Sequence, residues 1–357
     1  MYKEISIQQY LEKAQKVQII DVRSPKEFKH AHIPGAINMP LFDDAERAIV
    51  GTAYKQEGRE IAILKGLEIV GPKMAPMVAE IKEKFSGKPI VLHCWRGGMR
   101  SKSVATLLSF CGIDTEVIKG GYKSYRKEVQ NLFLQNMEYI ILGGRTGSAK
   151  TKILSALKTS GEQVIDLEKL ANHKGSAFGD LGEDVQPTTE MFENLLFEGL
   201  RFFEMDKRIW LEDESHLIGT VFIPETIWQQ MRTAPVIYCN FPVEERIKFL
   251  VETYGHFDKA GVINSVNKIT KRLGGQHAKA ILEFYEAGNL YEATKLVLVY
   301  YDKSYNYGLS QRIAENIFEI KMEKINPTEN ANEILQFIGD KGISNKKNIS
   351  LQQINLH

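Results

Sequence analysis

Hydrophobic and polar positions alternate along the first third of the chain in two distinct rhythms. Short apolar runs rich in Ile and Val, typical of buried strands, occur at residues 17–20, 90–93 and 115–118. Apolar residues spaced three or four apart, typical of a helix that packs on one face, occur at residues 27–31, 74–85 and 101–111. Because predicted strands alternate with predicted helices, we expect this part of the chain to form an α/β unit.

The alternation restarts at residue 139, after a helical connector at residues 125–137. Further strands are expected at residues 139–142, 163–166, 208–211 and 235–239, and helices at residues 150–158 and 188–207. Residues 243–338 are mostly helical in pattern, and the chain becomes polar from residue 341. We therefore predict two α/β domains, at residues 1–128 and 129–340, followed by a polar tail at residues 341–357.

Length, composition and charge narrow the class of protein. With 357 residues and 43% hydrophobic content, the chain is long enough for two cores. The net charge of +1 gives no global signal for nucleic-acid binding, so any such surface is local. The three cysteines lie far apart, which argues against a disulfide framework and against a zinc site. No apolar run approaches the roughly 18 residues of a membrane span, so we expect a cytoplasmic protein without a membrane partner.

A cysteine loop, LHCWRGGMRSKS at residues 92–103, is the first candidate for chemistry. It runs from a strand end through Cys94 to the start of a helix, and Gly97 and Gly98 allow backbone N–H groups to turn inward. Such donors, together with the helix N-terminus, stabilise a thiolate and a bound anion. We predict that Cys94 is a nucleophile. Arg100 is the expected anion ligand, and Arg96 is the second candidate.

A phosphate-binding loop follows the strand at residues 139–142. The pattern G-x-x-x-x-G-K-[ST] is met except that Ala149 stands at the last glycine position. The predicted phosphate ligands are Gly144, Arg145, Thr146, Gly147, Ser148, Ala149, Lys150 and Thr151. A methyl group is a small addition, so the loop is still expected to form.

Two further groups of polar residues follow predicted strands. Glu212 and Asp213 come after an apolar strand, as a Walker B carboxylate does, and are candidates for holding Mg²⁺. Asp21 and Arg23 also lie at a strand end, where we expect an ion pair that fixes the neighbouring loop. No tightly bound metal or cofactor is otherwise predicted.

Taken together, these motifs resemble the tRNA 2-selenouridine synthase family, over nearly the whole chain. In the first domain the resemblance rests on DVRSPKEF, HIPGAINMPLF, GTAYKQEGRE, CWRGGMRS and GGYKSYR. In the second it rests on GGRTGSAKT, DLEKLANHKGSAFG, LEDESHLIG, LGGQHAKAI and YYDKSY. The resemblance implies a rhodanese-like doubly wound domain, followed by a P-loop parallel-sheet domain with a largely helical C-terminal part.

The resemblance also implies a reaction. In this family the sulfur of 2-thiouridine at the tRNA wobble position is replaced by selenium from selenophosphate, through an S-geranylated intermediate made from geranyl diphosphate. Cys94 matches the family's catalytic cysteine, which is taken to carry selenium as an S-selanyl group. We expect the phosphate loop to bind the diphosphate of geranyl diphosphate.

Two other functions are compatible with the motifs. The Cys-x5-Arg spacing equals that of phosphatase loops, so a Cys-dependent phosphatase or a sulfurtransferase coupled to a P-loop ATPase is one alternative. An ATP-gated binding module with an inert rhodanese-like scaffold is the other. Unchanged tRNA modification in a Cys94→Ser strain would favour the binding module.

Overall fold

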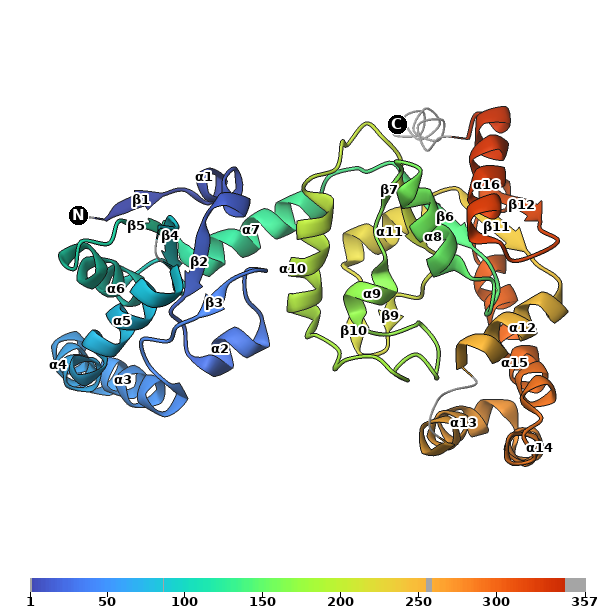
Figure 1. The fold of residues 1–357 in the computed structure, drawn as a ribbon, viewed down its shortest axis with the longest axis horizontal. Helices are drawn as coiled ribbons and strands as arrows, with labels where there is room; N and C mark the ends of the chain where they lie inside the picture. The colour runs from blue at the N-terminus through green and yellow to red at the C-terminus, as the bar shows by residue number, and fades with distance from the viewer. Residues whose placement is uncertain (1, 86, 255–258, 344–357) are drawn as a thin grey trace, which may run out of the picture. The chain divides into compact units, whose positions relative to one another are not determined.

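The computed structural model describes residues 2–85, 87–254 and 259–343. The chain divides into two compact units, Met1–Leu132 and Phe133–His357 (Figure 1). Most of the tail predicted from residue 341 lies outside the described residues. Throughout the described residues, every helix is too short or too polar to cross a membrane.

The first unit is built around a five-stranded parallel sheet with the strand order β1-β5-β4-β2-β3. Its strands are β1 (Lys3–Ile5), β2 (Gln18–Asp21), β3 (Ile37–Asn38), β4 (Ile90–His93) and β5 (Thr115–Ile118). Its helices are α1 (Ile7–Leu11), α2 (Pro25–His30), α3 (Asp44–Gln56), α4 (Arg59–Val70), α5 (Met74–Phe85), α6 (Met99–Phe110) and α7 (Gly121–Phe133). All four residues of β4 are buried, as expected for a central parallel strand covered by helices on both faces.

Local signals set the helix starts in this unit. Asp43 and Glu46 form a reciprocal capping box at the start of α3, which satisfies two otherwise free backbone N–H groups. Ser24 and Glu27 do the same for α2, where Pro25 occupies the first turn. Because β2 pairs with β4, the ends of these two strands bring Asp21 beside His93, immediately before Cys94.

The second unit contains another five-stranded parallel sheet, with the order β12-β11-β6-β8-β7, and a two-stranded ribbon of β9 and β10. Its strands are β6 (Tyr139–Gly143), β7 (Gln163–Val164), β8 (Ile209–Glu212), β9 (Leu217–Ile218), β10 (Val221–Phe222), β11 (Val236–Asn240) and β12 (Ile317–Lys321). Its helices are α8 (Lys150–Thr159), α9 (Leu167–Ala171), α10 (Thr189–Leu200), α11 (Glu225–Thr233), α12 (Val243–Tyr254), α13 (Lys259–Leu273), α14 (Gly275–Glu286), α15 (Leu290–Ser310) and α16 (Pro327–Lys341).

The strand order of the second sheet positions the phosphate loop. β6 lies in the middle, between β11 and β8, and Leu142 of β6 pairs with Glu212 of β8. The loop after β6 therefore emerges beside the acidic residues that end β8. In open parallel sheets, ligands bind at this carboxyl edge.

The architecture confirms the predicted α/β fold, but several boundaries differ. Strands β1 and β12 were not predicted. Helix α10 ends at Leu200 rather than at residue 207. Beyond the helix end, the side chain of Gln163 forms hydrogen bonds with backbone groups that a longer helix would have paired internally. Its amide exchanges two hydrogen bonds with the backbone of Glu204, at 2.6 and 3.0 Å. The strand predicted at residues 163–166 is also shorter, and ends at Val164.

Candidate functional site

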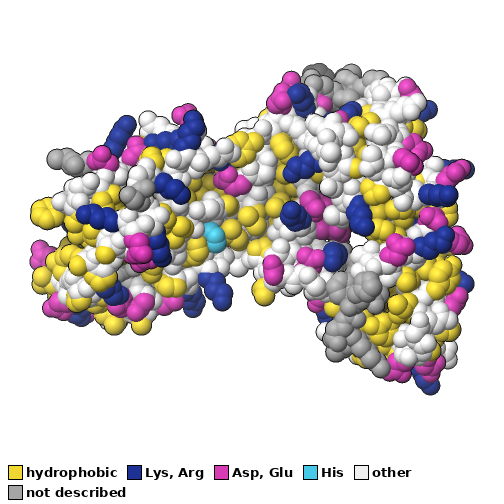
Figure 2. Space-filling view, in the orientation of Figure 1, with side chains coloured by type: hydrophobic (Ala, Val, Ile, Leu, Met, Phe, Trp, Pro, Cys, Tyr) yellow, Lys and Arg dark blue, Asp and Glu magenta, His cyan; other side chains and the backbone are white. Residues whose placement is uncertain are grey.

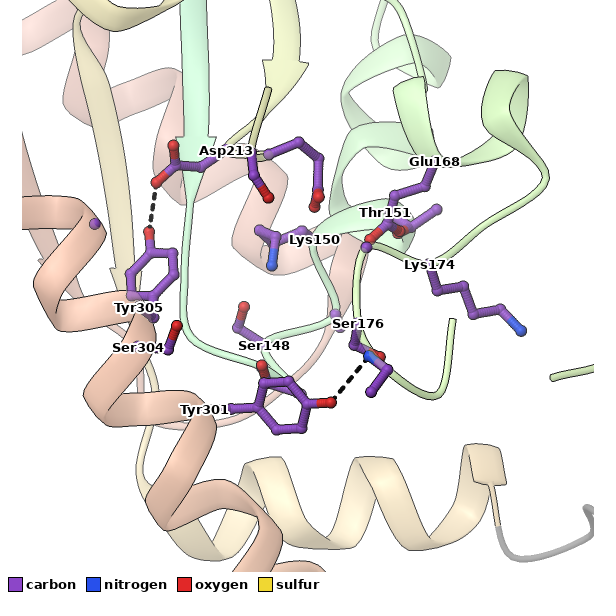
Figure 3. Close-up of a pocket in the computed structure, with 18 of the residues that line it drawn as sticks. Ser148, Lys150, Thr151, Glu168, Lys174, Ser176, Asp213, Tyr301, Ser304 and Tyr305 are labelled. Carbon is purple, nitrogen blue, oxygen red and sulfur yellow. Dashed lines mark hydrogen bonds between the residues drawn. The ribbon is translucent and has the colours of Figure 1, made fainter. Parts of the chain in front are cut away.

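The phosphate loop links β6 to α8 in the second unit, and its backbone is fixed from several sides (Figure 3). The N–H of Gly144 donates to the hydroxyl of Tyr305 at 2.8 Å. The N–H of Ser148 donates to the carbonyl of Arg145 at 3.1 Å. The ammonium of Lys150 donates to the Gly144 carbonyl at 3.0 Å, so the lysine folds back over its own loop. Its charge lies where a phosphate would be held.

Ala149 is accommodated at the glycine position with local strain. Its φ is +55°, in the left-handed region, which an alanine adopts at a cost of about 1–2 kcal/mol. Gly147, at φ +86°, is required for space as well as conformation, because an added Cβ would lie 2.9 Å from the Arg246 carbonyl. Arg246 also donates to the carbonyl of Thr146 at 3.1 Å and forms a two-pronged ion pair with Asp302. The neighbouring helices therefore hold the loop open from outside.

Two carboxylates, Glu168 and Glu214, line the same cavity as the phosphate loop. Glu214 packs against Gly175, where an added Cβ would meet its carboxylate at 2.4 Å. Burial and then the neighbouring Glu168 raise the pKa of Glu214 well above its usual value. The hydroxyl of Thr151 donates to Glu168 at 2.9 Å. Glu168, Glu214 and Thr151 thus supply oxygen atoms to the cavity that Lys150 also lines.

The two acidic residues predicted to hold Mg²⁺ are already engaged. Asp213 accepts hydrogen bonds from Arg312 at 2.5 Å and from Tyr305 at 2.9 Å. Glu212 is fully buried and accepts from the Leu167 N–H at 3.0 Å. Burial, then the charges of Asp166 and Glu168, raise the pKa of Glu212 well above its usual value. Among the described residues, no three His, Cys, Asp or Glu side chains are arranged to hold a metal ion by themselves.

The phosphate loop lines a cavity of about 1010 Å³. A smaller, apolar pocket of about 100 Å³ shares Thr146, Ser176, Leu250 and Tyr301 with it. The wall of the smaller pocket comes from the helices after β11, from the segment before α10 that contains Phe178 and Leu181, and from Thr146. Its apolar residues include Phe178, Leu181, Val262, Val266, Ile281, Ala293, Val297 and Leu298. The cavity that contains Lys150 and the apolar pocket therefore adjoin at these shared residues, among them Thr146 of the phosphate loop.

In the first unit, the Cys94 loop has the cradle that its glycines predict. The N–H of Gly98 and the hydroxyl of Ser101 each donate to the Cys94 sulfur at 3.3 Å. Gly97 has φ +61°, and an added Cβ would lie 2.3 Å from the carbonyl of Ile118. Cys94 itself is buried, with 3% of its surface exposed.

The residues around this loop are fixed by ion pairs. Arg23 and Asp21 form a fully buried pair at 2.6 Å, as predicted. Burial raises the Asp21 pKa, but the charges of His93 and Arg23 and the hydrogen bonds from Arg23 outweigh it, so the net pKa is lowered. Arg100 binds Glu27 at 2.6 Å.

Comparisons with known proteins identify the family of the chain. The family model described as "tRNA 2-selenouridine synthase AAA domain" matches residues 137–333, and the rhodanese-like domain model matches residues 6–128. The chain belongs to the tRNA 2-selenouridine synthase family. A relative of that name from Sulfurovum sp. (strain NBC37-1) is 32% identical over 86% of this chain and 93% of its own.

Two further similarities complete the comparison. A tRNA 2-selenouridine synthase from Hydrogenovibrio crunogenus is 33% identical over 83% of this chain and 90% of its own. The solved N-terminal domain of a putative ATP/GTP binding protein from Clostridium difficile 630 is 42% identical. It covers 36% of this chain and 98% of its own, with a TM-score of 0.34.

In this member of the family, the structure shows where the predicted site residues lie and which residues they contact. Thr146 to Thr151 line one cavity, whereas Gly144 and Arg145 do not, and Cys94 lies in its own cradle. Arg96 is exposed, whereas Arg100 is held by Glu27, a contact that sequence reasoning did not foresee. Burial raises the pKa of Cys239 to about 12, which disfavours its thiolate form.

Several site residues were missed by sequence reasoning. Tyr305 of α15 and Arg246 of α12 lie far from the phosphate loop in the chain but contact its backbone at Gly144 and Thr146. Arg312, which follows α15, contacts Asp213. Tyr305 lies within YYDKSY, a stretch on which the family resemblance rested. That was the available signal.

Proposed function

We propose that this protein converts 2-thiouridine at the tRNA wobble position into 2-selenouridine in two steps. The first step geranylates the sulfur with geranyl diphosphate, and the second replaces the geranylated sulfur with selenium from selenophosphate. Membership of the family supports the overall conversion, since the relatives carry the name tRNA 2-selenouridine synthase.

The observation that carries the geranylation step is the junction of two cavities at Thr146. Geranyl diphosphate has a highly charged end and an apolar ten-carbon end. The phosphate loop offers backbone donors and Lys150 to the first, and the apolar pocket between α12 and α15 accepts the second. A nucleotide would place a polar sugar and base in the position of the prenyl chain, which this pocket does not suit.

The loop residues fit the chemistry of the first step. The bond between C1 of the geranyl chain and the diphosphate oxygen breaks, and the oxygen retains the electron pair. The thiocarbonyl sulfur of the uridine forms the new bond to C1. Donors fixed before the reaction stabilise charge as it develops on the leaving oxygen, and Lys150 is placed for that role.

Mg²⁺ suits the oxygen atoms beside the loop, although the protein alone does not form a cage for it. Magnesium is typically held by one or two carboxylates together with substrate phosphates. The hydroxyl of Thr151 and the carboxylates of Glu168 and Glu214 are the available ligands. A bound Mg²⁺ would screen the charge of the diphosphate. Asp213 is engaged by Arg312 and Tyr305 and is not among these ligands.

For the second step we propose a covalent intermediate on Cys94. In the net exchange, selenium bonds to C2 of the uridine, sulfur leaves with its electron pair as geranylthiolate, and water hydrolyses the P–Se bond to give phosphate. An S-selanyl group on Cys94 is two electrons more oxidised than selenide and would need an oxidant to form when phosphorus leaves as phosphate. The intermediate that balances is an S-phospho group: the Cys94 thiolate attacks phosphorus, the P–Se bond breaks, selenium leaves with its electron pair as hydroselenide, and water then releases phosphate from the cysteine. Arg96, exposed at the loop, is the cation proposed to hold the selenophosphate, because Arg100 is held by Glu27.

The phosphatase alternative is less well supported. Its loop requires the arginine at Cys-x5-Arg to be available to a phosphate, and Arg100 is held by Glu27 through two hydrogen bonds, at 2.6 and 3.3 Å.

The test is a reaction with purified protein, thiolated tRNA, geranyl diphosphate, selenophosphate and a thiol, analysed by mass spectrometry of the nucleosides. We expect the geranylated nucleoside to appear first and selenouridine to follow. Conversion that proceeds without geranyl diphosphate would refute the two-step scheme.

A further inference from the structure

A second apolar cleft lies in the first unit and takes no part in the function described so far. Its volume is about 580 Å³, within the range of roughly 300–1,000 Å³ typical of small-molecule sites. Three helices form it, α3, α4 and α6. The apolar residues that line it include Leu41, Phe42, Val50, Ala62, Ile63, Leu67, Val70, Met74, Val104 and Leu107.

The cleft begins at the helix turn that cradles the thiol. Ser101, in the first turn of α6, donates to the Cys94 sulfur. Met99 and Arg100, on either side in the same turn, line the cleft, followed by Ser103, Val104 and Leu107 along the same helix. Spacings of three and four residues place these side chains on one face of α6. One helix therefore presents Ser101 to the sulfur and a neighbouring face to the cleft.

Apart from Lys55 on α3, the charged side chains of the cleft lie at one end of it. Arg100 and Arg47 meet at the Cys94 end, where both lie beside Glu27, at 2.6 and 3.8 Å. Away from it, α3 and α4 contribute apolar side chains that remain partly exposed. Leu67 is 54% exposed and Tyr54 is 58% exposed, and Figure 2 shows hydrophobic side chains at the surface of this part of the unit. Contiguous apolar surface of this kind is uncommon without a ligand or partner.

We propose that this cleft receives the geranyl chain of the geranylated tRNA while selenium replaces sulfur. The inference rests on the proposed function, because the chain is present only if geranylation precedes selenation. With C2 of the uridine at the Cys94 loop, the sulfur substituent needs an apolar space that starts there. During the exchange the C2–S bond breaks, the sulfur keeps the electron pair, and the geranylthiolate takes a proton from solvent. The apolar contacts hold the chain while that bond breaks.

The proposal accounts for two apolar sites in one protein. The pocket at Thr146 would hold the chain when it is attached to diphosphate, and the α3–α4–α6 cleft would hold it when it is attached to the base. Variants of the cleft should therefore affect selenation of geranylated RNA and should discriminate by chain length.

The experiment uses the full-length protein with Ser103→Trp, which fills the cleft from α6. Thr106→Trp is the matched control, because both residues are exposed on α6. The hydroxyl of each donates to the carbonyl four residues earlier, and Thr106 does not line the cleft. The substrates are two anticodon stem-loop RNAs, one with S-geranyl-2-thiouridine and one with S-methyl-2-thiouridine. The readout is kcat/KM for selenouridine formation with selenophosphate and a thiol.

We expect wild type and Thr106→Trp to prefer the geranylated RNA at least tenfold over the methylated RNA. Ser103→Trp should abolish that preference by lowering kcat/KM for the geranylated RNA only. Leu67→Asp, which introduces a charge at an exposed position of the cleft, is a second variant and should act in the same direction.

The outcomes separate this inference from the proposed function. If wild type is active, and Ser103→Trp and Leu67→Asp prefer the geranylated RNA as strongly as Thr106→Trp does, the cleft assignment alone is overturned. A wild-type protein that forms no selenouridine from geranylated RNA overturns both. An equal loss with both RNAs in folded Ser103→Trp and Leu67→Asp would show that the cleft supports the Cys94 loop rather than the chain, and would also overturn the inference.

Discussion

Replacement of Lys150 by alanine should remove geranyl transfer while sparing the second step. The ammonium of Lys150 lies over the phosphate loop, 3.0 Å from the Gly144 carbonyl, at the edge of the cavity that we assign to the diphosphate. Its removal deletes the mobile positive charge of the loop and leaves the backbone donors in place. Lys150→Ala protein should therefore fold and still bind tRNA, but should fail to stabilise the departing diphosphate.

The size of the effect follows from the kind of contact that is lost. A charge-assisted contact made to a developing anion contributes about 2–4 kcal/mol in the transition state, which corresponds to a roughly 30- to 1,000-fold fall in rate. A second effect adds to it. The charge of Lys150 lowers the pKa of Glu214, which burial and Glu168 raise, so the variant should hold its Glu214 proton more firmly and bind Mg²⁺ more weakly.

The assay measures geranyl transfer to thiolated tRNA without ATP, and in parallel measures selenation of tRNA supplied already geranylated. Lys150→Ala should lose the first activity and keep the second. Lys158→Ala, an exposed lysine on the same helix, is the control and should keep both. The reasoning is refuted if geranyl transfer requires added ATP, or if Lys150→Ala transfers geranyl at the wild-type rate.

Four further predictions test other parts of the account. Cys94→Ala should lose selenation and retain geranylation in nucleoside mass spectrometry, and equal loss of both in folded protein would contradict the division between the two units. Arg23→Met should destabilise the first unit by about 3–5 kcal/mol in denaturant unfolding, because a buried carboxylate at Asp21 loses its partner; a change below 1 kcal/mol would be unexpected. The pKa of Glu212 is raised in the folded protein, so folding favours the protonated carboxyl. The free energy of unfolding is therefore highest below the usual glutamate pKa and falls as the pH rises through the folded pKa. The melting temperature of Glu212→Gln relative to wild type should therefore increase with pH, and a constant difference would contradict this assignment. Ala293→Phe, in the apolar pocket beside Thr146, should shift the preferred substrate from geranyl towards dimethylallyl diphosphate in competition assays, and an unchanged preference would place the chain elsewhere.

The sequence was sufficient for the elements whose signals are local. The strands β2, β4, β5 and β6 were predicted from short apolar runs in the sequence, and α5 was predicted with the limits that the structure shows. The glycines at residues 97 and 147 indicated tight loops because only glycine combines a positive φ with such close backbone contacts.

Features that depend on distant partners could not be obtained in this way. Strands β1 and β12 are edge strands of five residues or fewer, and their register is set by β5 and β11 rather than by their own pattern. Likewise, nothing near Arg100 indicates that Glu27, in a different helix, would bind it. Asp213 follows the strand as predicted, yet Arg312 and Tyr305 from the far end of the chain decide what its carboxylate does.

The central claim is that one chain geranylates 2-thiouridine in tRNA and then exchanges the geranylated sulfur for selenium. The most direct measurement is a time course with the purified protein, in which thiolated tRNA, geranyl diphosphate and selenophosphate are combined with a thiol and the wobble nucleoside is identified by mass spectrometry. The account predicts that S-geranyl-2-thiouridine rises and then falls as 2-selenouridine accumulates, and that omission of geranyl diphosphate leaves 2-thiouridine unchanged. Formation of 2-selenouridine at an undiminished rate without geranyl diphosphate would contradict it.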